Sequence, residues 1–180
     1  SGWDKIIVSS DKDFFQLCDD KTYIYRPIQD KIVSKSTILE EFKIHPNNFA
    51  LARAIAGDPS DNLPGVSGVG LKTIAKRFSF LANEEEYDSE TIINNCAMQA
   101  KRLKLHENII KSSDLIKSNY KIMQLYSPNI RPINRYTVDN AIMHFEPEFS
   151  KLNFTKMLFE DDCGYINFEE LTRIMKNVKR

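Results

Sequence analysis

The sequence has no net charge, no long apolar run and only three cysteines. Its apolar stretches are far shorter than the roughly 20 residues that cross a membrane, and no signal-peptide pattern opens it. Cys18, Cys96 and Cys163 are odd in number and lack the spacing of a metal site or a disulfide framework. We therefore expect a soluble, cytoplasmic protein with reduced thiols.

The balance of 25 basic and 25 acidic residues excludes a protein held to nucleic acid by overall charge. A local patch is the remaining possibility, and one candidate exists. The segment 63–83 has no acid and carries Lys72, Lys76 and Arg77. Aspartates precede it at positions 11, 13, 19 and 20. An acidic cluster beside a basic segment is typical of a metal-dependent enzyme that acts on phosphates.

A length of 180 residues, 42% of them hydrophobic, suits one globular domain with its own core. Residues 5–9 are typical of a short buried strand, and residues 11–17 switch to helical spacing. This α/β order places Asp11 and Asp13 at the carboxyl end of a strand. Segments 22–26 and 31–33 indicate a small hairpin or edge pair. The fold class is thus an α/β start of one to a few strands, followed by a mainly α-helical remainder.

Capping signals predict where several helices begin and end. Thr37 and Glu40 form a capping-box pattern with Thr37 as the cap. Pro46 suits the start of a helix over 47–56, and Gly57 suits its end. Further helical segments are predicted at 89–103, 106–125, 138–145, 154–159 and 168–178.

The most informative stretch has the core Pro64-Gly-Val-Ser-Gly-Val-Gly70 and opens a helix. Its glycines permit positive φ and close approach of another molecule to the backbone: Gly65, Gly68 and Gly70. Outward-facing amides at a helix start favour a phosphate, which Lys72 and Lys76, one turn apart, could flank. The alternative is a tight turn between two core helices with a solvated lysine face. A Rossmann-type loop fits less well, because a helix-like run precedes the segment and no Walker Lys-Ser/Thr pair occurs.

The longer stretch, Gly57-Asp-Pro-Ser-Asp-Asn-Leu-Pro-Gly-Val-Ser-Gly-Val-Gly70 with Lys72-Thr-Ile-Ala75, resembles the helix-hairpin-helix signature of the flap endonuclease/5′-3′ exonuclease family. That family includes phage enzymes of the ribonuclease H type and the 5′-nuclease domain of bacterial DNA polymerase I. Val8-Ser-Ser-Asp-Lys-Asp-Phe-Phe-Gln-Leu17 resembles the family's strand-end motif. Both motifs occur in the family's order and cover residues 5 to 80.

The resemblance implies a partial 5′-nuclease (PIN-like) fold with a helix-hairpin-helix domain. It implies DNA contacts from Gly65, Gly68, Gly70, Lys72, Lys76 and Arg77. It also implies a monovalent cation, usually K⁺, that meets a DNA phosphate and is held by the backbone carbonyls of Pro64, Val66 and Val69.

Four aspartates are the candidate catalytic carboxylates: Asp11, Asp13, Asp58 and Asp61. Magnesium prefers hard oxygen ligands, and phosphodiester hydrolysis commonly uses two divalent ions about 4 Å apart. From the residues alone, helix capping and an Asx-turn around Pro59 explain these side chains equally well. The resemblance favours a metal site in which Asp11, Asp13 and Asp61 hold Mg²⁺ or Mn²⁺ and Asp58 assists.

The chain departs from the family at its front, where a full-length member has two strand-borne aspartates, a basic arch and an acidic motif. We therefore expect the carboxy-terminal part of a nuclease, with weak or no activity alone and an amino-terminal half that is missing or is a separate polypeptide. Without that half, an apolar surface at Ile6, Ile7 and Val8 would be exposed. The expected regions are 1–45, a remnant of the nuclease core that carries metal-binding aspartates; 46–86, the hairpin region; and 87–180, a helical end.

The implied function is cleavage of branched or 5′-ended DNA, and of RNA–DNA hybrids, in replication or repair, without sequence readout. One alternative is a non-catalytic helix-hairpin-helix DNA-binding module that retains the aspartates. Another is a structural helical protein with an incidental Gly-rich turn. Residues 159–170 imitate part of a calcium loop but lack key ligands, so a surface joint between helices is the preferred interpretation there.

Overall fold

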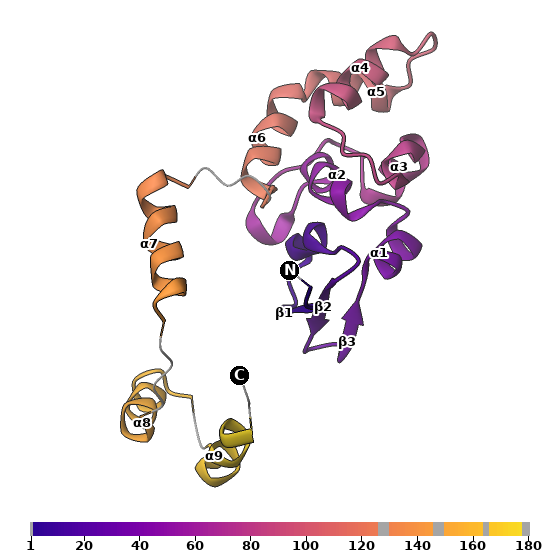
Figure 1. The fold of residues 1–180 in the computed structure, drawn as a ribbon. Coiled ribbons are helices and arrows are strands. Elements are labelled where there is room, and N and C mark those ends of the chain that lie inside the picture. The colour runs from indigo at the N-terminus through magenta and orange to yellow at the C-terminus, as the bar shows by residue number, and fades with distance from the viewer. Residues whose placement is uncertain (1, 126–129, 146–149, 164–165, 178–180) are drawn as a thin grey trace. The chain divides into compact units, whose positions relative to one another are not determined.

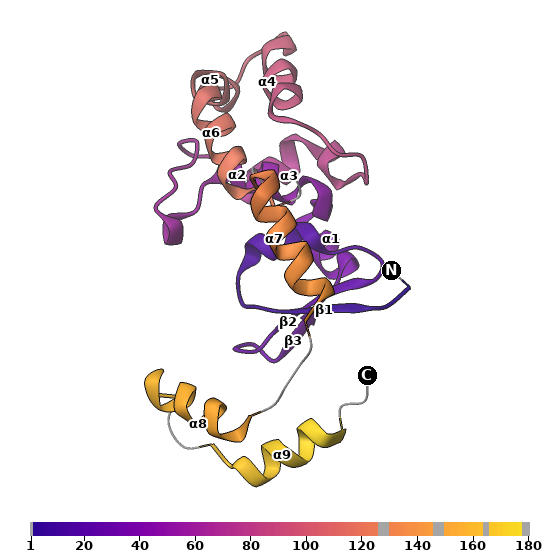
Figure 2. The same ribbon diagram turned by 60° about the vertical axis from the view of Figure 1, so that its left-hand side comes forward.

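The computed structural model describes residues 2–125, 130–145, 150–163 and 166–177. The chain divides into two compact units, Ser1–Asn129 and Ile130–Arg180. Figure 1 and Figure 2 show that the first unit places a small sheet at one end and helices beyond it. No described helix combines the length and the apolar character needed to cross a bilayer.

Three strands form a mixed sheet in the order β1-β2-β3 (Figure 1). Strand β1 (Lys5–Val8) pairs in parallel with β2 (Thr22–Arg26), and β2 pairs antiparallel with β3 (Lys31–Val33). The predicted strand and hairpin are thereby confirmed. The parallel pair requires a crossover, which the 3₁₀ helix η1 (Lys12–Leu17) supplies between β1 and β2.

Helix α2 (Phe49–Ala56) lies at the centre of the first unit, and every residue from Phe49 to Ile55 is buried. It packs mainly against α6 (Ser113–Met123) and also against η1 and α3 (Leu71–Arg77). Aromatic rings join the sheet side to this helix, because Phe15 lies 5.4 Å from Phe49 and Phe42 lies 5.2 Å from Phe49 between ring centroids. Such tilted ring pairs stabilise a core beyond the area they bury.

The first helices begin and end at specific side-chain bonds. Helix α1 (Lys35–Phe42) is capped by Ser34, whose hydroxyl accepts from the Thr37 amide, so the prediction of Thr37 as the cap was wrong by one turn. Pro46 opens a short 3₁₀ turn, η2 (Pro46–Asn48), directly before α2. Gly57 ends α2 with φ +78°, as the glycine at that place predicted.

Short helices complete the first unit. After η3 (Pro59–Asp61) come α3 (Leu71–Arg77), η4 (Ser79–Ala82), α4 (Ser89–Met98), α5 (Lys104–Lys111) and α6 (Ser113–Met123). The helix predicted over 89–103 stops early because the backbone of Gln99 is extended. The helix predicted over 106–125 is two helices, broken at Ser112, whose amide is shared between the Asn108 and Ile109 carbonyls.

One face of the sheet is not covered by any described element of the first unit. The register sets Ile6 beside Tyr23 and Val8 beside Tyr25, and Tyr25 pairs in turn with Ile32. Ile6, Val8 and Ile32 are 61%, 66% and 58% exposed. Ile7 points the other way and packs against the core, so the expected exposed surface forms at Ile6 and Val8 but not at Ile7.

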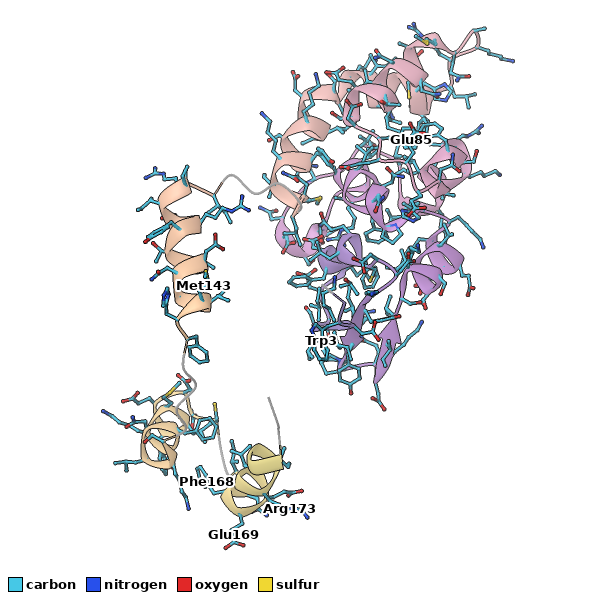
Figure 3. All side chains as sticks on the ribbon, in the orientation of Figure 1. Trp3, Glu85, Met143, Phe168, Glu169 and Arg173 are labelled. Atoms are coloured by element: carbon cyan, nitrogen blue, oxygen red, sulfur yellow. The ribbon has the colours of Figure 1, made fainter. Side chains whose placement is uncertain are left out.

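The second unit consists of α7 (Pro132–Met143), α8 (Lys151–Glu160) and α9 (Phe168–Asn177). Helix α7 begins six residues before the predicted segment, since Pro132 sits at the first helical turn, where a missing N–H costs nothing. Helices α8 and α9 meet through an edge-to-face pair of Phe154 and Phe168. Figure 3 labels Phe168 at the start of α9. The glycine of the imitated calcium loop, at position 164, lies outside the described residues.

Candidate functional site

The first pair of predicted carboxylates lies at the carboxyl end of β1, as the α/β order indicated. Asp11 is the N-cap of η1, and its Oδ1 accepts from the amide of Asp13 at 2.8 Å. The capping role that the sequence left open is therefore present. A cap leaves the second carboxylate oxygen available, so it does not compete with a ligand role.

The second pair lies in the connection between α2 and α3. Asp58 caps η3, and its Oδ1 accepts from the amide of Ser60 at 3.0 Å and from the Ser60 hydroxyl at 2.5 Å. The bond from the Ser60 hydroxyl is the main reason why the pKa of Asp58 lies below its usual range. Asp58 and Leu63 exchange backbone bonds at 2.8 and 2.9 Å, which closes a tight loop around the exposed Asp61.

A buried arginine joins the two pairs. Nη2 of Arg53, in the last turn of α2, lies 2.9 Å from Oδ1 of Asp13 and also pairs with Oδ2 of Asp58. Burial is the largest influence on Asp13 and raises its pKa; Arg53 opposes this rise. The charges of the three other aspartates raise it further.

Arg53 is the functional residue that sequence reasoning missed. The signal was available, because a single arginine interrupts the otherwise apolar run Phe49-Ala-Leu-Ala-Arg-Ala-Ile-Ala56. A charge on the buried face of a helix requires a partner of opposite sign.

Three of the four aspartates surround one surface hollow of about 320 Å³. Its lining comes from the end of β1, the end of α2 and the loop around η3: Ser10, Asp11, Lys12, Arg53, Asp58, Ser60 and Asp61. Asp13 reaches this group through its ion pair with Arg53. The tertiary structure thus brings together residues about 50 positions apart in the sequence, as a shared site requires.

The donor chemistry of this group fits a divalent ion, since all four carboxylates offer the hard oxygens that Mg²⁺ and Mn²⁺ prefer. The arrangement is more open than a finished metal cage. Across the part of the chain that the structure describes, no three acidic, histidine or cysteine side chains converge tightly enough to hold a metal ion. Asp11, Asp13 and Asp61 as divalent ligands therefore stay a prediction.

The Gly-rich hairpin closes directly onto the end of α2. The amide of Val66 donates to the Ile55 carbonyl at 2.8 Å, and a Cβ on Gly65 would lie 2.0 Å from the Ala56 carbonyl oxygen. Only glycine fits at position 65, because the two backbones touch there. This close contact fixes the hairpin relative to the carboxylate loop at Asp58.

The tip of the hairpin is open. Gly68 has φ +75°, and a Cβ on Gly68 or Gly70 would meet no atom within 4 Å. Gly70 precedes α3, whose exposed cations are Lys72, Lys76 and Arg77. Val66 and Val69 are buried beneath the tip and hold it to the core. The expected arrangement of accessible backbone and flanking cations is therefore present.

Two of the carbonyls expected to hold K⁺ already accept one hydrogen bond. The Pro64 oxygen accepts from the buried Asn119 amide at 2.9 Å, and the Val66 oxygen accepts from the Val69 N–H at 3.0 Å. A carbonyl oxygen has a second lone pair, so a cation contact remains compatible with these bonds. The K⁺ site at Pro64, Val66 and Val69 stays a prediction.

The chain is similar in sequence to known proteins, although no protein-family model matches it. DNA polymerase I of Rhizobium leguminosarum is 31% identical over 125 residues, which are 69% of this chain and 12% of that protein. The 5′-3′ exonuclease of Aquifex aeolicus is 29% identical over 139 residues, which are 66% of this chain and 48% of that protein. The chain thus spans less than half the length of these relatives.

Solved structures show the same fold. The 5′-exonuclease of bacteriophage T5 with bound zinc matches with a TM-score of 0.54 at 23% identity, over 74% of this chain and 45% of that one. A T5 flap endonuclease in complex with DNA and metal ions matches with a TM-score of 0.54 at 22% identity, over 77% of this chain and 47% of that one. The expected partial 5′-nuclease fold is confirmed by this likeness.

Proposed function

Since the chain belongs to the 5′-3′ exonuclease and flap endonuclease family and matches part of it, we propose that it is the carboxy-terminal, DNA-gripping part of a structure-specific 5′-nuclease. In this role it binds the backbone of branched or 5′-ended duplex DNA and supplies part of a two-metal site. One observation supports the proposal above others. The carboxylate loop of Asp58 and Asp61 leads directly into the hairpin at Pro64, so DNA gripped by the hairpin lies next to the acidic hollow.

The hairpin would hold DNA through its backbone and its cations. Amides at Gly68 and Gly70 can donate to a phosphate without contacting a base, and Lys72 and Lys76 neutralise the neighbouring phosphates. Binding of this kind is independent of sequence. It accommodates RNA–DNA hybrids as well as DNA, because both present phosphates along a duplex.

The aspartates would hold the divalent ions. Bound Mg²⁺ or Mn²⁺ supplies a hydroxide nucleophile and stabilises the leaving oxygen. Asp11, Asp13 and Asp61 offer carboxylate oxygens to the ions, and Asp58 keeps the loop around Asp61 closed through its bonds to Ser60 and Leu63. A K⁺ ion at the hairpin carbonyls would add a further contact with the phosphate.

A second polypeptide segment completes the proposed enzyme. The outer face of the sheet carries exposed Ile6, Val8 and Ile32, and strands that pair in parallel are normally covered on both faces. An amino-terminal nuclease half seated on this face would bury these side chains and bring the remaining catalytic carboxylates. We expect this chain alone to bind DNA and to cleave it weakly or not at all.

The decisive experiment measures binding and cleavage of a 5′-flap duplex side by side. The purified chain is titrated by fluorescence anisotropy over a range of salt, and cleavage is followed with Mg²⁺ before and after addition of the amino-terminal half of a relative. We expect salt-sensitive binding by the chain and metal-dependent cleavage by the mixture. Binding of the two halves to each other without cleavage would contradict the proposed catalytic role.

The matched variants are two double substitutions that remove the same charge. K72Q/K76Q removes hairpin lysines, and K31Q/K43Q removes exposed lysines near the sheet. Loss of two phosphate contacts should weaken binding by roughly tenfold or more at low salt and lower the salt slope by about 2. The control pair should change neither quantity. Equal effects of the two pairs would point to general charge attraction.

A non-catalytic DNA-binding module is the second candidate function. It is favoured by the capping bonds of Asp11 and Asp58, which account for an aspartate at each of these two positions without any metal. The variant D11N/D13N separates the candidates. A module would keep its DNA affinity and show no metal binding before or after substitution, whereas a nuclease part would lose metal binding.

A further inference from the structure

A single nitrogen of Arg53 pairs with two carboxylates: Asp13, which the proposed function makes a metal ligand, and Asp58, which keeps the loop around Asp61 closed. Its Nη2 lies 2.9 Å from Asp13 and pairs closely with Asp58, and the arginine side chain is only 10% exposed. The side chains of Asp13 and Asp58 are 20% and 10% exposed. Charges so well removed from water interact strongly, and either carboxylate without its partner would be costly to bury.

The charges around the hollow do not balance. Four carboxylates, at positions 11, 13, 58 and 61, face two cations, Lys12 and Arg53, so the group carries a formal charge of 2 − 4 = −2. Of the two cations, Arg53 is buried and Lys12 is exposed. A divalent cation has the charge that would neutralise the group, and it would approach carboxylates that Arg53 already occupies.

The hydrogen bonds of Arg53 indicate that it contributes to the carboxylate site through its positive charge more than through a fixed set of hydrogen bonds. Nε of Arg53 is buried and has no hydrogen-bond partner among the described residues, whereas Nη2 is shared between two acceptors. A structural arginine normally uses its planar fork to bind a carboxylate through two parallel bonds. Here both carboxylates are held by the same nitrogen, so a displacement of Nη2 would release both aspartates.

We propose that Arg53 is a built-in counter-ion of the carboxylate site, which holds Asp13 and Asp58 in place before a divalent ion binds and competes with that ion for Asp13. Arg53 is then a positioning residue that lowers the affinity of the site for divalent ions. The guanidinium cannot lose its proton in a protein, so it yields only by moving. The inference rests on the proposed function, because that function makes Asp13 a ligand of the competing ion.

The test measures Mn²⁺ binding directly, by the electron paramagnetic resonance signal of free Mn²⁺, on the whole chain without DNA. The variant R53Q keeps a polar side chain of similar length and removes the charge. We expect R53Q to bind Mn²⁺ at least about tenfold more tightly than the parent chain. We also expect Mn²⁺ to raise the melting temperature of R53Q more than that of the parent chain, because the unneutralised aspartates gain more from the ion.

Two further variants make the result specific. R53K keeps the charge as a compact ammonium that cannot reach both carboxylates equally, so its Mn²⁺ affinity should fall between those of the parent chain and R53Q. R26Q is the control, because Arg26 is also a partly buried arginine near the hollow, but it donates to the Ser10 carbonyl and stacks on Phe15. Its removal should change Mn²⁺ affinity far less.

Several outcomes would overturn the inference. They are equal or weaker Mn²⁺ binding by folded R53Q, an equal gain in R26Q, or no binding by any variant. If R53Q does not fold, R53K must still bind more tightly than the parent chain. The proposed function is judged separately, by the loss of DNA binding in K72Q/K76Q and by cleavage in the two-half mixture, neither of which depends on Arg53 as a competitor.

Discussion

The side-chain amide of Asn119, in the middle of α6, donates to the Pro64 carbonyl at 2.9 Å and to the Ala54 carbonyl at 3.0 Å. The two acceptors belong to the end of α2 and to the start of the hairpin. Asn119 is 2% exposed, and its bond to Ala54 is buried while its bond to Pro64 is part-buried. One side chain therefore connects α6, the end of α2 and the start of the hairpin that is proposed to bind DNA.

Replacing Asn119 by leucine should destabilise the protein by about 1–3 kcal/mol, because the buried Ala54 carbonyl and the part-buried Pro64 carbonyl both lose their donor. DNA affinity should fall as well, since the hairpin would no longer be fixed to α6. Urea unfolding gives the free energy, and anisotropy gives the affinity. The control is N108L, which removes a bond from the Asn108 amide to the Ser67 carbonyl at an exposed site. A cost for N119L no larger than that for N108L would contradict the role of Asn119.

Two glycines of the hairpin should respond in opposite ways to alanine. G65A places a Cβ against the Ala56 carbonyl, so overpacking should cost about 1–3 kcal/mol or more. Gly70 has an ordinary φ of −103° and open space around it, so G70A should leave the free energy of unfolding almost unchanged. Thermal unfolding of both variants checks this contrast, and a similar melting temperature for the two would contradict it.

The same G70A variant tests the proposed phosphate contact. Because the added methyl group projects into open space at the tip of the hairpin, it should hinder a phosphate that approaches the backbone. DNA affinity should therefore fall while stability is kept. Unchanged affinity would place the bound phosphate elsewhere on the hairpin.

Asp88 should make stability depend on pH at acid values. Its Oδ1 accepts from the Thr91 hydroxyl at 2.7 Å and from the Thr91 amide at 2.8 Å as the cap of α4. The bond from the Thr91 hydroxyl is the main cause of its lowered pKa. The bonded form is the ionised one, so its stabilisation is complete above the unfolded-state pKa of about 3.9. It is lost as the pH falls through the lower folded-state value.

D88A should accordingly cost about 0.5–2 kcal/mol at neutral pH, as expected for the loss of an N-cap. The gap in free energy of unfolding between D88A and the parent chain should narrow below about pH 4. Urea unfolding at a series of pH values measures it. T91V, which keeps the amide donor and removes the hydroxyl, should show a smaller gap of the same form. A gap for D88A that stays constant down to acid pH would show that the cap acts without its charge.

The two faces of the sheet should tolerate substitution differently. Ile24 is fully buried, so I24A should destabilise the chain by about 2–5 kcal/mol. Ile6 is largely exposed, so I6S should change the free energy of unfolding by no more than about 0.5 kcal/mol. If the amino-terminal half covers this face, I6S should nevertheless weaken association of the halves, measured by calorimetry. Normal association of I6S would move the docking surface away from β1.

The sequence by itself determined the family, the strand-end aspartates and the hairpin, because each depends on residues that are close together in the chain. Glycine at a tight turn, aspartate at a helix start and β-branched residues in a strand act through the local backbone, so their spacing is readable before any folding. The caps of Asp11 and Asp58, the end of α2 at Gly57 and the open tip at Gly68 all follow from such local chemistry.

Only the tertiary structure decided which distant groups meet. The pairing of Arg53 with Asp13 spans 40 positions of the sequence, and the bond from Asn119 to Pro64 spans 55. Neither Arg53 nor Asn119 belongs to a sequence motif. Local patterns also failed at Ser112, where two helices replace one, and at Ile7, which turns toward the core. These features depend on burial and on which groups pack against each other. A buried charge or amide needs a partner, and tertiary packing supplies that partner from residues that are distant in sequence.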